Sequence, residues 1–252
     1  MLSDAEKRRY KCHIMIPGVG ETGQEKLKKA RVLVVGAGGL GAPVLQYLTA
    51  AGVGSIGIMD DDSVNEDNLH RQILYGGHDL GKLKTIISKQ RLNTLNPFVS
   101  HDIVNLHLKP ENALGLISQY DIIVDTTDSS SCSYLINDAC IIADKPWVYG
   151  ALRKFEGLVS SFNFMNGPSL RCAFPDAAKK HSEHPSQTGM FGVLPGIVGS
   201  LQAAEVIKIL TGIGEPLSGK LLVYNMLNND FSSMLFEKNT ENFKISQLLD
   251  SY

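Results

Sequence analysis

Apolar and polar residues follow one another along this chain in blocks that predict strands and helices in turn. Two short apolar runs, 32–35 and 55–59, are bounded by polar residues, and such runs are typical of strands buried on both faces of a sheet. Between them, residues 42–51 place apolar side chains at helical spacing. This order of strand, helix and strand predicts a parallel βαβ unit.

The same alternation continues to about residue 150, after which strands follow one another with fewer helices between them. The further predicted strands cover 99–104, 120–125, 147–149, 157–164, 220–224 and 231–235. The further predicted helices cover 24–30, 82–95, 134–143, 201–210 and 245–249. We therefore expect one domain over residues 1–252, with an α/β, doubly wound (Rossmann-like), mostly parallel sheet and an antiparallel C-terminal extension.

The segment 176–186 has neither helical nor strand periodicity. It is polar and contains Pro185, which disfavours both regular structures. We therefore predict a mobile loop there. It belongs to a mixed C-terminal part over about 151–252, which follows a core over about 30–150.

A glycine-rich turn joins the first predicted strand to the helix that follows it. Gly36, Gly38 and Gly41 form the pattern G-x-G-x-x-G, which permits a tight turn, close approach to a phosphate and close helix packing. Asp60 ends the second predicted strand, where a carboxylate suits ribose hydroxyl groups. A tight turn without a ligand is the alternative, but the strand–turn–helix context favours a nucleotide site.

Three charged residues are predicted to lie at the same edge of the sheet as this turn. Arg71 and Lys84 follow the second strand and can neutralise phosphates. Asp128 follows the fourth strand, where a Mg²⁺ ion that bridges phosphates could bind. The alternatives left open are solvated surface charges for the two cations and a helix N-cap for Asp128.

The overall composition argues against several classes of protein. The hydrophobic fraction of 43% is that of a globular domain, and the net charge of −2 argues against a general nucleic-acid or membrane-surface binder. No run approaches the length of a membrane span, and the N-terminus lacks a signal-peptide core. Cys12, Cys132, Cys140 and Cys172 show no paired spacing, so we expect reduced thiols in a cytoplasmic protein.

Several short motifs, taken in order, carry a family resemblance. They are GQEKL at 23–27, RVLVVGAGGLG at 31–41, DDD at 60–62, NLHRQ at 68–72, GKLK at 81–84, DTTD at 125–128, RCAFP at 171–175 and GIVGSLQAAE at 196–205. With them, residues 9–236 resemble the bacterial adenylating enzymes MoeB, ThiF and HesA, relatives of the ubiquitin-activating enzymes. The number and order of the motifs make the resemblance specific, and it favours ATP binding.

The resemblance implies a reaction and a set of site residues. The implied cofactor-binding residues are Gly36, Gly38, Gly39, Gly41, Asp60, Asp62, Asn68 and Gln72. The implied catalytic residues are Arg71 and Lys84, which with Asn68 hold the triphosphate, and Asp128, which binds Mg²⁺. A carboxylate attacks the α-phosphate of ATP and gives an acyl-adenylate and pyrophosphate. Because the nucleophile is already ionised at neutral pH, no general base is required.

Two departures from the family concern cysteine chemistry. Many members hold a structural zinc with two C-x-x-C pairs, but here the first reads Ser169-x-x-Cys172 and residues 236–252 contain no cysteine. One thiolate cannot make a tetrahedral Cys₄ site, so we expect no structural zinc. The loop before Gly189 also lacks the family's cysteine, so we expect no covalent capture of the product there.

A third departure lies near the N-terminus. Where the family has an arginine that reaches ATP phosphates across a dimer interface, this chain has Cys12. Lys11 or Arg9 could substitute, although lysine does not reproduce the bidentate geometry of arginine. The family is usually homodimeric, and the apolar segment 192–210 is predicted to form either part of that interface or an internal helix.

The sequence therefore predicts an ATP-dependent adenylyltransferase that acts on the C-terminal glycine of a ubiquitin-like sulfur-carrier protein. The alternative is adenylation of a small-molecule or peptide carboxylate in a specialised biosynthetic pathway, which the missing cysteines keep open. A nicotinamide oxidoreductase and a non-catalytic nucleotide-binding scaffold fit less well. The chain has no evident hydride-transfer acid, and it keeps the residues implied to hold a triphosphate.

Overall fold

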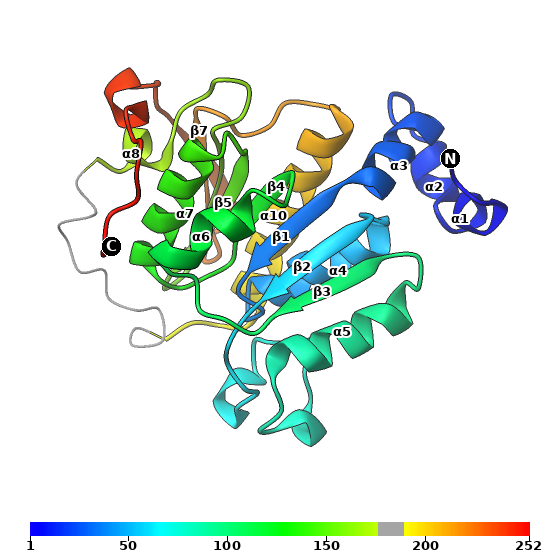
Figure 1. Ribbon diagram of the computed structural model, residues 1–252. Coiled ribbons are helices and arrows are strands. Elements are labelled where there is room, and N and C mark those ends of the chain that lie inside the picture. The colour runs from blue at the N-terminus through cyan, green and yellow to red at the C-terminus, as the bar shows by residue number, and fades with distance from the viewer. Residues whose placement is uncertain (176–188) are drawn as a thin grey trace.

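Eight strands form one mixed sheet in the computed structural model, which describes residues 1–175 and 189–252 (Figure 1). The strands are β1 (Arg31–Val35), β2 (Ser55–Met59), β3 (Ser100–Val104), β4 (Ile122–Asp125), β5 (Trp147–Arg153), β6 (Glu156–Phe162), β7 (Lys220–Asn225) and β8 (Asp230–Leu235). Their order across the sheet is β3-β2-β1-β4-β5-β6-β7-β8. The pairs among β1 to β5 are parallel and the pairs from β5 to β8 are antiparallel, which confirms the predicted fold class.

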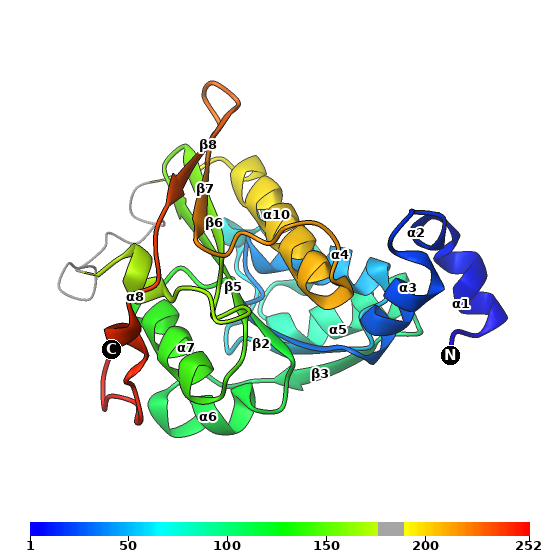
Figure 2. The same ribbon diagram turned by 90° about the horizontal axis from the view of Figure 1, so that it is seen from above.

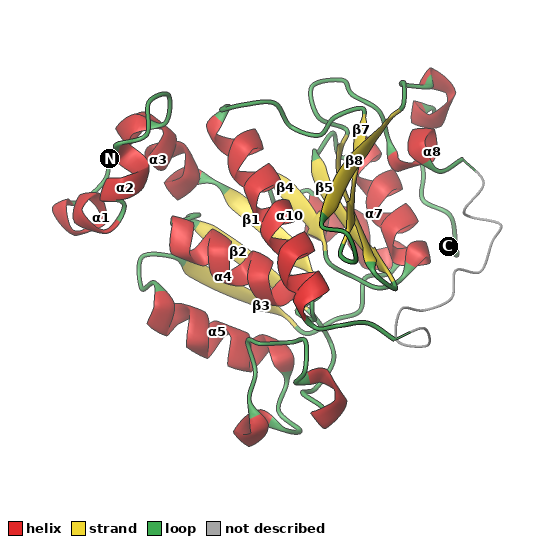
Figure 3. Ribbon diagram, turned by 180° about the vertical axis from the view of Figure 1, so that it is seen from behind, coloured by secondary structure: helices red, strands yellow, loops and turns green. Residues whose placement is uncertain are grey.

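Helices cover both faces of this sheet (Figure 2, Figure 3). They are α1 (Asp4–Arg9), α2 (Lys11–Ile14), α3 (Gly20–Lys29), α4 (Gly41–Ala51), α5 (Lys84–Leu95), α6 (Pro110–Ile117), α7 (Ser130–Ile142), α8 (Leu170–Ala173) and α10 (Val193–Thr211). Side chains of α4, α5 and α10 pack in one apolar core, and those of α6 and α7 in the other. In β1, Val32 and Val34 belong to the first core and Leu33 and Val35 to the second. The continuous apolar run in the sequence follows from burial on both faces.

Helix α10 begins earlier than predicted, at Val193 rather than at residue 201. The sequence prediction placed the glycine-rich residues 192–199 before the helix, but Gly199 lies inside it. An added Cβ at Gly199 would lie 2.5 Å from the main-chain oxygen of Leu40, next to the start of α4. The glycine is needed for this close approach of two helices, and it does not end the helix.

Helix α10 also corrects the expectation that no run is long enough to span a membrane. By length and composition alone it would qualify, with a mean hydropathy of 1.5 over its most apolar window. The helix packs against α4, β5 and β6 in the fold (Figure 2). Its apolar composition is therefore explained by this internal position, as in other core helices.

Other segments show smaller differences from the sequence prediction. Strand β5 runs to Arg153 instead of residue 149, because it pairs with β6 along its whole length. Helix α6 was not predicted, although Pro110 at its start is a known helix signal. Residues 245–249 are not helical, and the nearest helical turn is a 3₁₀ helix at Thr240–Phe243. The predicted loop over 176–186 falls outside the described residues.

The strand order reverses at β1, which lies between β2 and β4. The chain leaves β1 through α4 on one face to reach β2, and it reaches β4 through α6 on the other face. In open α/β sheets such a switch point forms a crevice at the carboxyl ends of the strands, where ligands bind.

Candidate active site

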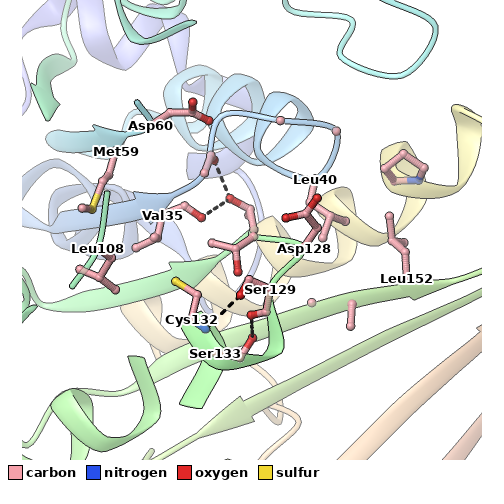
Figure 4. Close-up of a pocket in the computed structure, with 18 of the residues that line it drawn as sticks. Val35, Leu40, Met59, Asp60, Leu108, Asp128, Ser129, Cys132, Ser133 and Leu152 are labelled. Carbon is pink, nitrogen blue, oxygen red and sulfur yellow. Dashed lines mark hydrogen bonds between the residues drawn. The ribbon is translucent and has the colours of Figure 1, made fainter. Parts of the chain in front are cut away.

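A cavity of about 570 Å³ lies at the carboxyl ends of β1, β2 and β4 (Figure 4). The structure brings all but one of the predicted site residues to its lining. These are Gly36, Gly38, Gly39, Asp60, Asp62, Asn68, Arg71, Gln72, Lys84 and Asp128. The switch point therefore assembles in one place side chains that the sequence distributes over residues 36–128.

Gly41 is the predicted residue that does not line the cavity, and its role is packing. An added Cβ at Gly41 would lie 2.2 Å from the main-chain oxygen of Gly36, so α4 starts directly against the glycine-rich loop. Gly36 itself has a φ of +101°, and a Cβ there would lie 2.9 Å from the main-chain oxygen of Thr126. Both glycines are required by backbone approach, one from the helix and one from the segment after β4.

Asp60, just beyond β2, is hydrogen-bonded to the glycine-rich loop. Its Oδ2 accepts a hydrogen bond from the backbone N–H of Ala37 at 2.7 Å, and its Oδ1 accepts one from the N–H of Asp62 at 2.9 Å. Burial raises the pKa of the Asp60 carboxyl, although the Lys84 ammonium opposes this shift. The carboxylate assigned to ribose from the sequence therefore also orders the loop.

Lys84 is the first residue of α5 and is only 4% exposed. Its Nζ lies 2.8 Å from Asp62 Oδ2 and 3.9 Å from Asp60 Oδ1. The surface-charge alternative is therefore wrong for Lys84, which is a buried and neutralised cation. The Lys84 ammonium has three N–H donors, so it can also donate to an anionic ligand in the cavity beside Asp62, whose side chain is 68% exposed.

Arg71 follows the 3₁₀ helix Glu66–Asn68 and differs from Lys84 in its partners. Its Nη1 donates to the main-chain oxygen of Asp67 at 2.8 Å and lies 2.7 Å from Nε2 of His70. In residues 1–175 and 189–252 its guanidinium forms no ion pair. No carboxylate of the described chain therefore neutralises the positive charge of Arg71, which suits it to an anionic ligand.

Two buried side-chain amides beside Arg71 carry acceptor atoms without a partner in the described protein. They are Asn68 Oδ1 and Gln72 Oε1. Asn68 is 8% and Gln72 4% exposed, and both line the cavity. Buried acceptors normally have a donor, so these two oxygens suit the hydroxyl or amino groups of a bound ligand.

Asp128 lies on the segment that follows β4 (Figure 4). The N-cap of α7 is Ser129, whose Oγ accepts a hydrogen bond from the backbone N–H of Cys132 at 3.3 Å. The N-cap alternative for Asp128 is therefore wrong. Within the described residues the Asp128 carboxylate forms no hydrogen bond or ion pair, so both of its oxygens can accept a ligand or metal.

The cavity also has a set of apolar side chains in its wall, which no sequence motif predicts. Its side chains include Met59, Leu106, Leu108, Tyr149, Leu152, Phe174, Met190 and Pro195. No local motif marks these residues, because strand order and chain path alone bring them beside the glycine-rich loop. The predicted site is therefore the polar wall of a cavity that also has an apolar one.

Cys132 and Cys172 have different surroundings: Cys172 does not line the cavity, and although burial opposes the shift, hydrogen bonds with Asn242 and Ser169 lower the pKa of its thiol. Cys132 lines the cavity, but burial raises the pKa of its thiol to about 12, so the thiol is protonated at neutral pH. Cys172 Sγ lies within 3.3 Å of the backbone N of Asn239 and 3.4 Å of Nδ2 of Asn242. Its sulfur accepts hydrogen bonds that hold the C-terminal segment.

The N-terminal residues considered as substitutes for the family arginine do not reach this cavity within the chain. Arg9 donates a hydrogen bond to the main-chain oxygen of Leu95. Lys11 and Cys12 are exposed on α2. None of the three lines the cavity.

The sequence relatives of this chain include adenylyltransferases. The ThiF family model matches residues 10–244. A sulfur carrier protein adenylyltransferase from Thermus thermophilus is 46% identical, over 93% of this chain and 89% of that protein. MoeZ from Mycobacterium tuberculosis, a probable adenylyltransferase/sulfurtransferase, is 42% identical over 99% of this chain, which spans 65% of MoeZ.

Solved structures agree with these sequence relatives in fold. Escherichia coli MccB crystallised with ATP has a TM-score of 0.82 at 23% identity, over 94% of this chain and 73% of that one. PaaA has a TM-score of 0.80 at 22% identity, over 94% and 76% of the two chains. Because the family model and the curated relatives cover nearly the whole sequence, the chain belongs to the ThiF family, as an adenylyltransferase of the ThiF/MoeB type.

Proposed function

We propose that this adenylyltransferase activates the C-terminal glycine of a ubiquitin-like sulfur-carrier protein as an acyl-adenylate. The observation that supports it most directly is that Arg71 and Asp128 line the same cavity. Within the described residues, neither has an ion-pair partner. One side chain suits phosphates and the other a metal that neutralises them. The 46% identity to a protein named for a sulfur carrier supports this class of substrate.

In the proposed reaction a carboxylate oxygen of the carrier attacks the α-phosphorus of ATP. The bond from that phosphorus to the oxygen bridging it to the β-phosphate breaks, and pyrophosphate leaves with the electron pair. Both reactants are anions, so the site must offset their repulsion. Arg71 and Lys84 both line the cavity, and each can donate to phosphate oxygens of ATP.

Mg²⁺ is part of the proposal because the donor set fits it. The cavity is lined by Asp128 after β4 and by Asp60, Asp61 and Asp62 after β2, and carboxylate oxygens are the ligands that Mg²⁺ prefers. Asp128 is the residue to which we assign the metal, because Asp60 is engaged by the glycine-rich loop and Asp62 by Lys84. A bound Mg²⁺ would neutralise phosphate charge.

We also propose that the protein is a homodimer without structural zinc. Phe191 and Val193, at the start of α10, are 61% and 59% exposed, and apolar surface of this kind suits a protein interface. Cys172 is already engaged by Asn239 and Asn242, which takes the place of metal ligation in holding the C-terminal segment. Light scattering tests the dimer, and elemental analysis tests the metal content.

Exchange of labelled pyrophosphate into ATP tests the proposed reaction. The purified protein is assayed with ATP, Mg²⁺ and one carboxylate at a time. The set includes an intact sulfur-carrier protein, the same carrier without its last glycine, a short peptide and small acids. We expect exchange with the intact carrier and none with the truncated carrier, which is the matched control.

Exchange supported only by the peptide or a small acid would contradict the sulfur-carrier proposal and favour a biosynthetic carboxylate. A thermal-shift panel adds an independent measurement. ATP with Mg²⁺ should raise the melting temperature and NAD should leave it unchanged, because only a ligand that binds the folded state stabilises it.

A further inference from the structure

We propose that Asp125 is a positioning residue, whose buried carboxylate holds segment 126–129 so that Asp128 lies in the cavity with the glycine-rich loop. Asp125 ends β4, is fully buried and does not itself line the cavity. The proposal rests on the proposed adenylation reaction, in which Asp128 is the carboxylate assigned to Mg²⁺.

Both oxygens of the Asp125 carboxylate are used, one on each side of Asp128. Oδ1 accepts hydrogen bonds from the backbone N–H of Thr127 at 3.0 Å and from its Oγ1 at 2.8 Å. Oδ2 accepts one from Oγ of Ser133, in the first turn of α7, at 2.5 Å. One carboxylate therefore ties residues before and after Asp128 to the end of β4.

The main chain at the same point is held from two further elements. Gln202, buried in α10, donates from Nε2 to the main-chain oxygen of Asp125 at 2.6 Å. Thr126 Oγ1 lies 2.8 Å from the main-chain oxygen of Val35 and 2.6 Å from that of Gly36. The turn that carries Asp128 is therefore joined to α10 and to the glycine-rich loop.

The chemistry of position 125 favours a positioning role over simple packing. The donors to the Asp125 carboxylate are neutral, and burial raises its pKa to about 6. By contrast, the buried carboxylate of Asp138 has the cation Arg171 at 2.7 Å. An apolar residue would fill a core position without the cost of a buried, unpaired charge. A carboxylate is explained at this position because its two oxygens accept the hydrogen bonds of Thr127 and Ser133.

The test compares Asp125→Ala with Asp125→Asn and with a matched control, Asp138→Ala. Asparagine keeps an acceptor for Thr127 and offers an N–H to Ser133, whereas alanine removes both contacts. Asp138 is 2% exposed and does not line the cavity, so its replacement measures general damage to the fold. The measured quantities are the melting temperature, kcat, the KM for ATP and the Mg²⁺ concentration that gives half-maximal exchange.

We expect Asp125→Ala to raise the half-maximal Mg²⁺ concentration and lower kcat, each by about 10- to 100-fold, as when a residue that orients a metal ligand is removed. The KM for ATP should change much less. Asp125→Asn should restore Mg²⁺ dependence to within about threefold of wild type, because the hydrogen bonds are kept. Asp138→Ala should lower only the melting temperature.

An unchanged Mg²⁺ dependence in folded Asp125→Ala, or an equal change in Asp138→Ala, would overturn the proposal. Ser133→Ala removes one of the donors and should shift Mg²⁺ dependence in the same direction by less. It serves as the test if Asp125→Ala does not fold. If none of the carboxylates supports pyrophosphate exchange by the wild type, the proposed adenylation reaction is wrong, and not the role of Asp125. The variants can then still be compared by the difference in melting temperature between ATP with Mg²⁺ and ATP with EDTA.

Discussion

The carboxyl ends of β2 and β4, on either side of β1, hold their carboxylates in different ways. Beyond β2, Asp60 accepts a hydrogen bond from the glycine-rich loop and lies 3.9 Å from the ammonium of Lys84. At β4, the donors to the Asp125 carboxylate are neutral groups of Thr127 and Ser133. Asp128 follows, exposed and without an ion pair among the described residues.

The difference indicates a division of roles within one cavity. Near β2, Lys84 pairs with Asp60 and Asp62, and Asp60 also orders the glycine-rich loop, so these two carboxylates are engaged within the described chain. Near β4, the carboxylate of Asp128 has no cation partner among the described residues, which leaves it able to bind a metal ion. Substitution of Asp128 should therefore change metal-dependent chemistry alone, whereas substitution of Lys84 should change folding stability as well as chemistry.

The largest expected effect is that of Asp128→Ala, which should lower pyrophosphate exchange by about 10³-fold or more because a charge-stabilising group is lost. The melting temperature should stay at the wild-type value, because the side chain makes no bond within the described residues. Exchange at close to the wild-type rate would show that the metal assignment, and with it the contrast between the two strand ends, is wrong.

Arg71→Ala and Lys84→Ala should each slow exchange by about 10²- to 10³-fold, and they should differ in stability. Loss of Lys84 leaves the largely buried Asp60 without its cation, so the melting temperature should fall. Loss of Arg71 breaks no ion pair in the described chain, so the melting temperature of Arg71→Ala should equal that of the wild type. Equal melting temperatures for the two variants would contradict the inference that Lys84 stabilises the fold through its ion pairs and Arg71 does not.

Asp125→Asn should make the protein more stable above about pH 6. The folded-state pKa of Asp125 is about 6 and its ordinary value is 3.8, so the folded state loses stability as pH rises from about 4 through 6. Asparagine does not ionise and avoids that loss. Melting temperatures of both proteins from pH 4 to 8 should diverge over this window and run parallel above it. Parallel curves throughout would contradict the unpaired burial of Asp125.

The smallest expected effect concerns His101 on β3, a buried base that also has neutral partners. It contacts Thr49 Oγ1 at 2.9 Å and Asn93 Oδ1 at 2.8 Å, and burial lowers its pKa to about 4 from an ordinary 6.5. The unfolded state therefore binds more protons between these values, and stability falls as pH drops from about 6.5 to 4. In His101→Gln the melting temperature should therefore change less with pH over that range. An equal change in wild type and variant would show that other groups dominate the pH dependence.

Much of the fold follows from local pattern. The prediction of β2 over 55–59 matches its bounds, because apolar residues ending at an acid mark a buried strand. The glycine spacing likewise identified a loop whose backbone approaches its neighbours closely. The start of α10 was predicted wrongly because Gly199 serves a contact with α4, which no local pattern reveals. Capping of α7 by Ser129 instead of Asp128 also depended on geometry.

By itself, the sequence determined the order of strands and helices and the polar residues that follow β2 and β4. Periodicity and glycine spacing act between near neighbours, so they can be read without a fold. Tertiary structure alone decided that Lys84 is neutralised by Asp62, that Arg71 is not paired within the described residues, and that Asp125 is buried. The physical reason is that charge state and positioning depend on contacts between distant residues, as between Gln202 and Asp125, 77 positions apart.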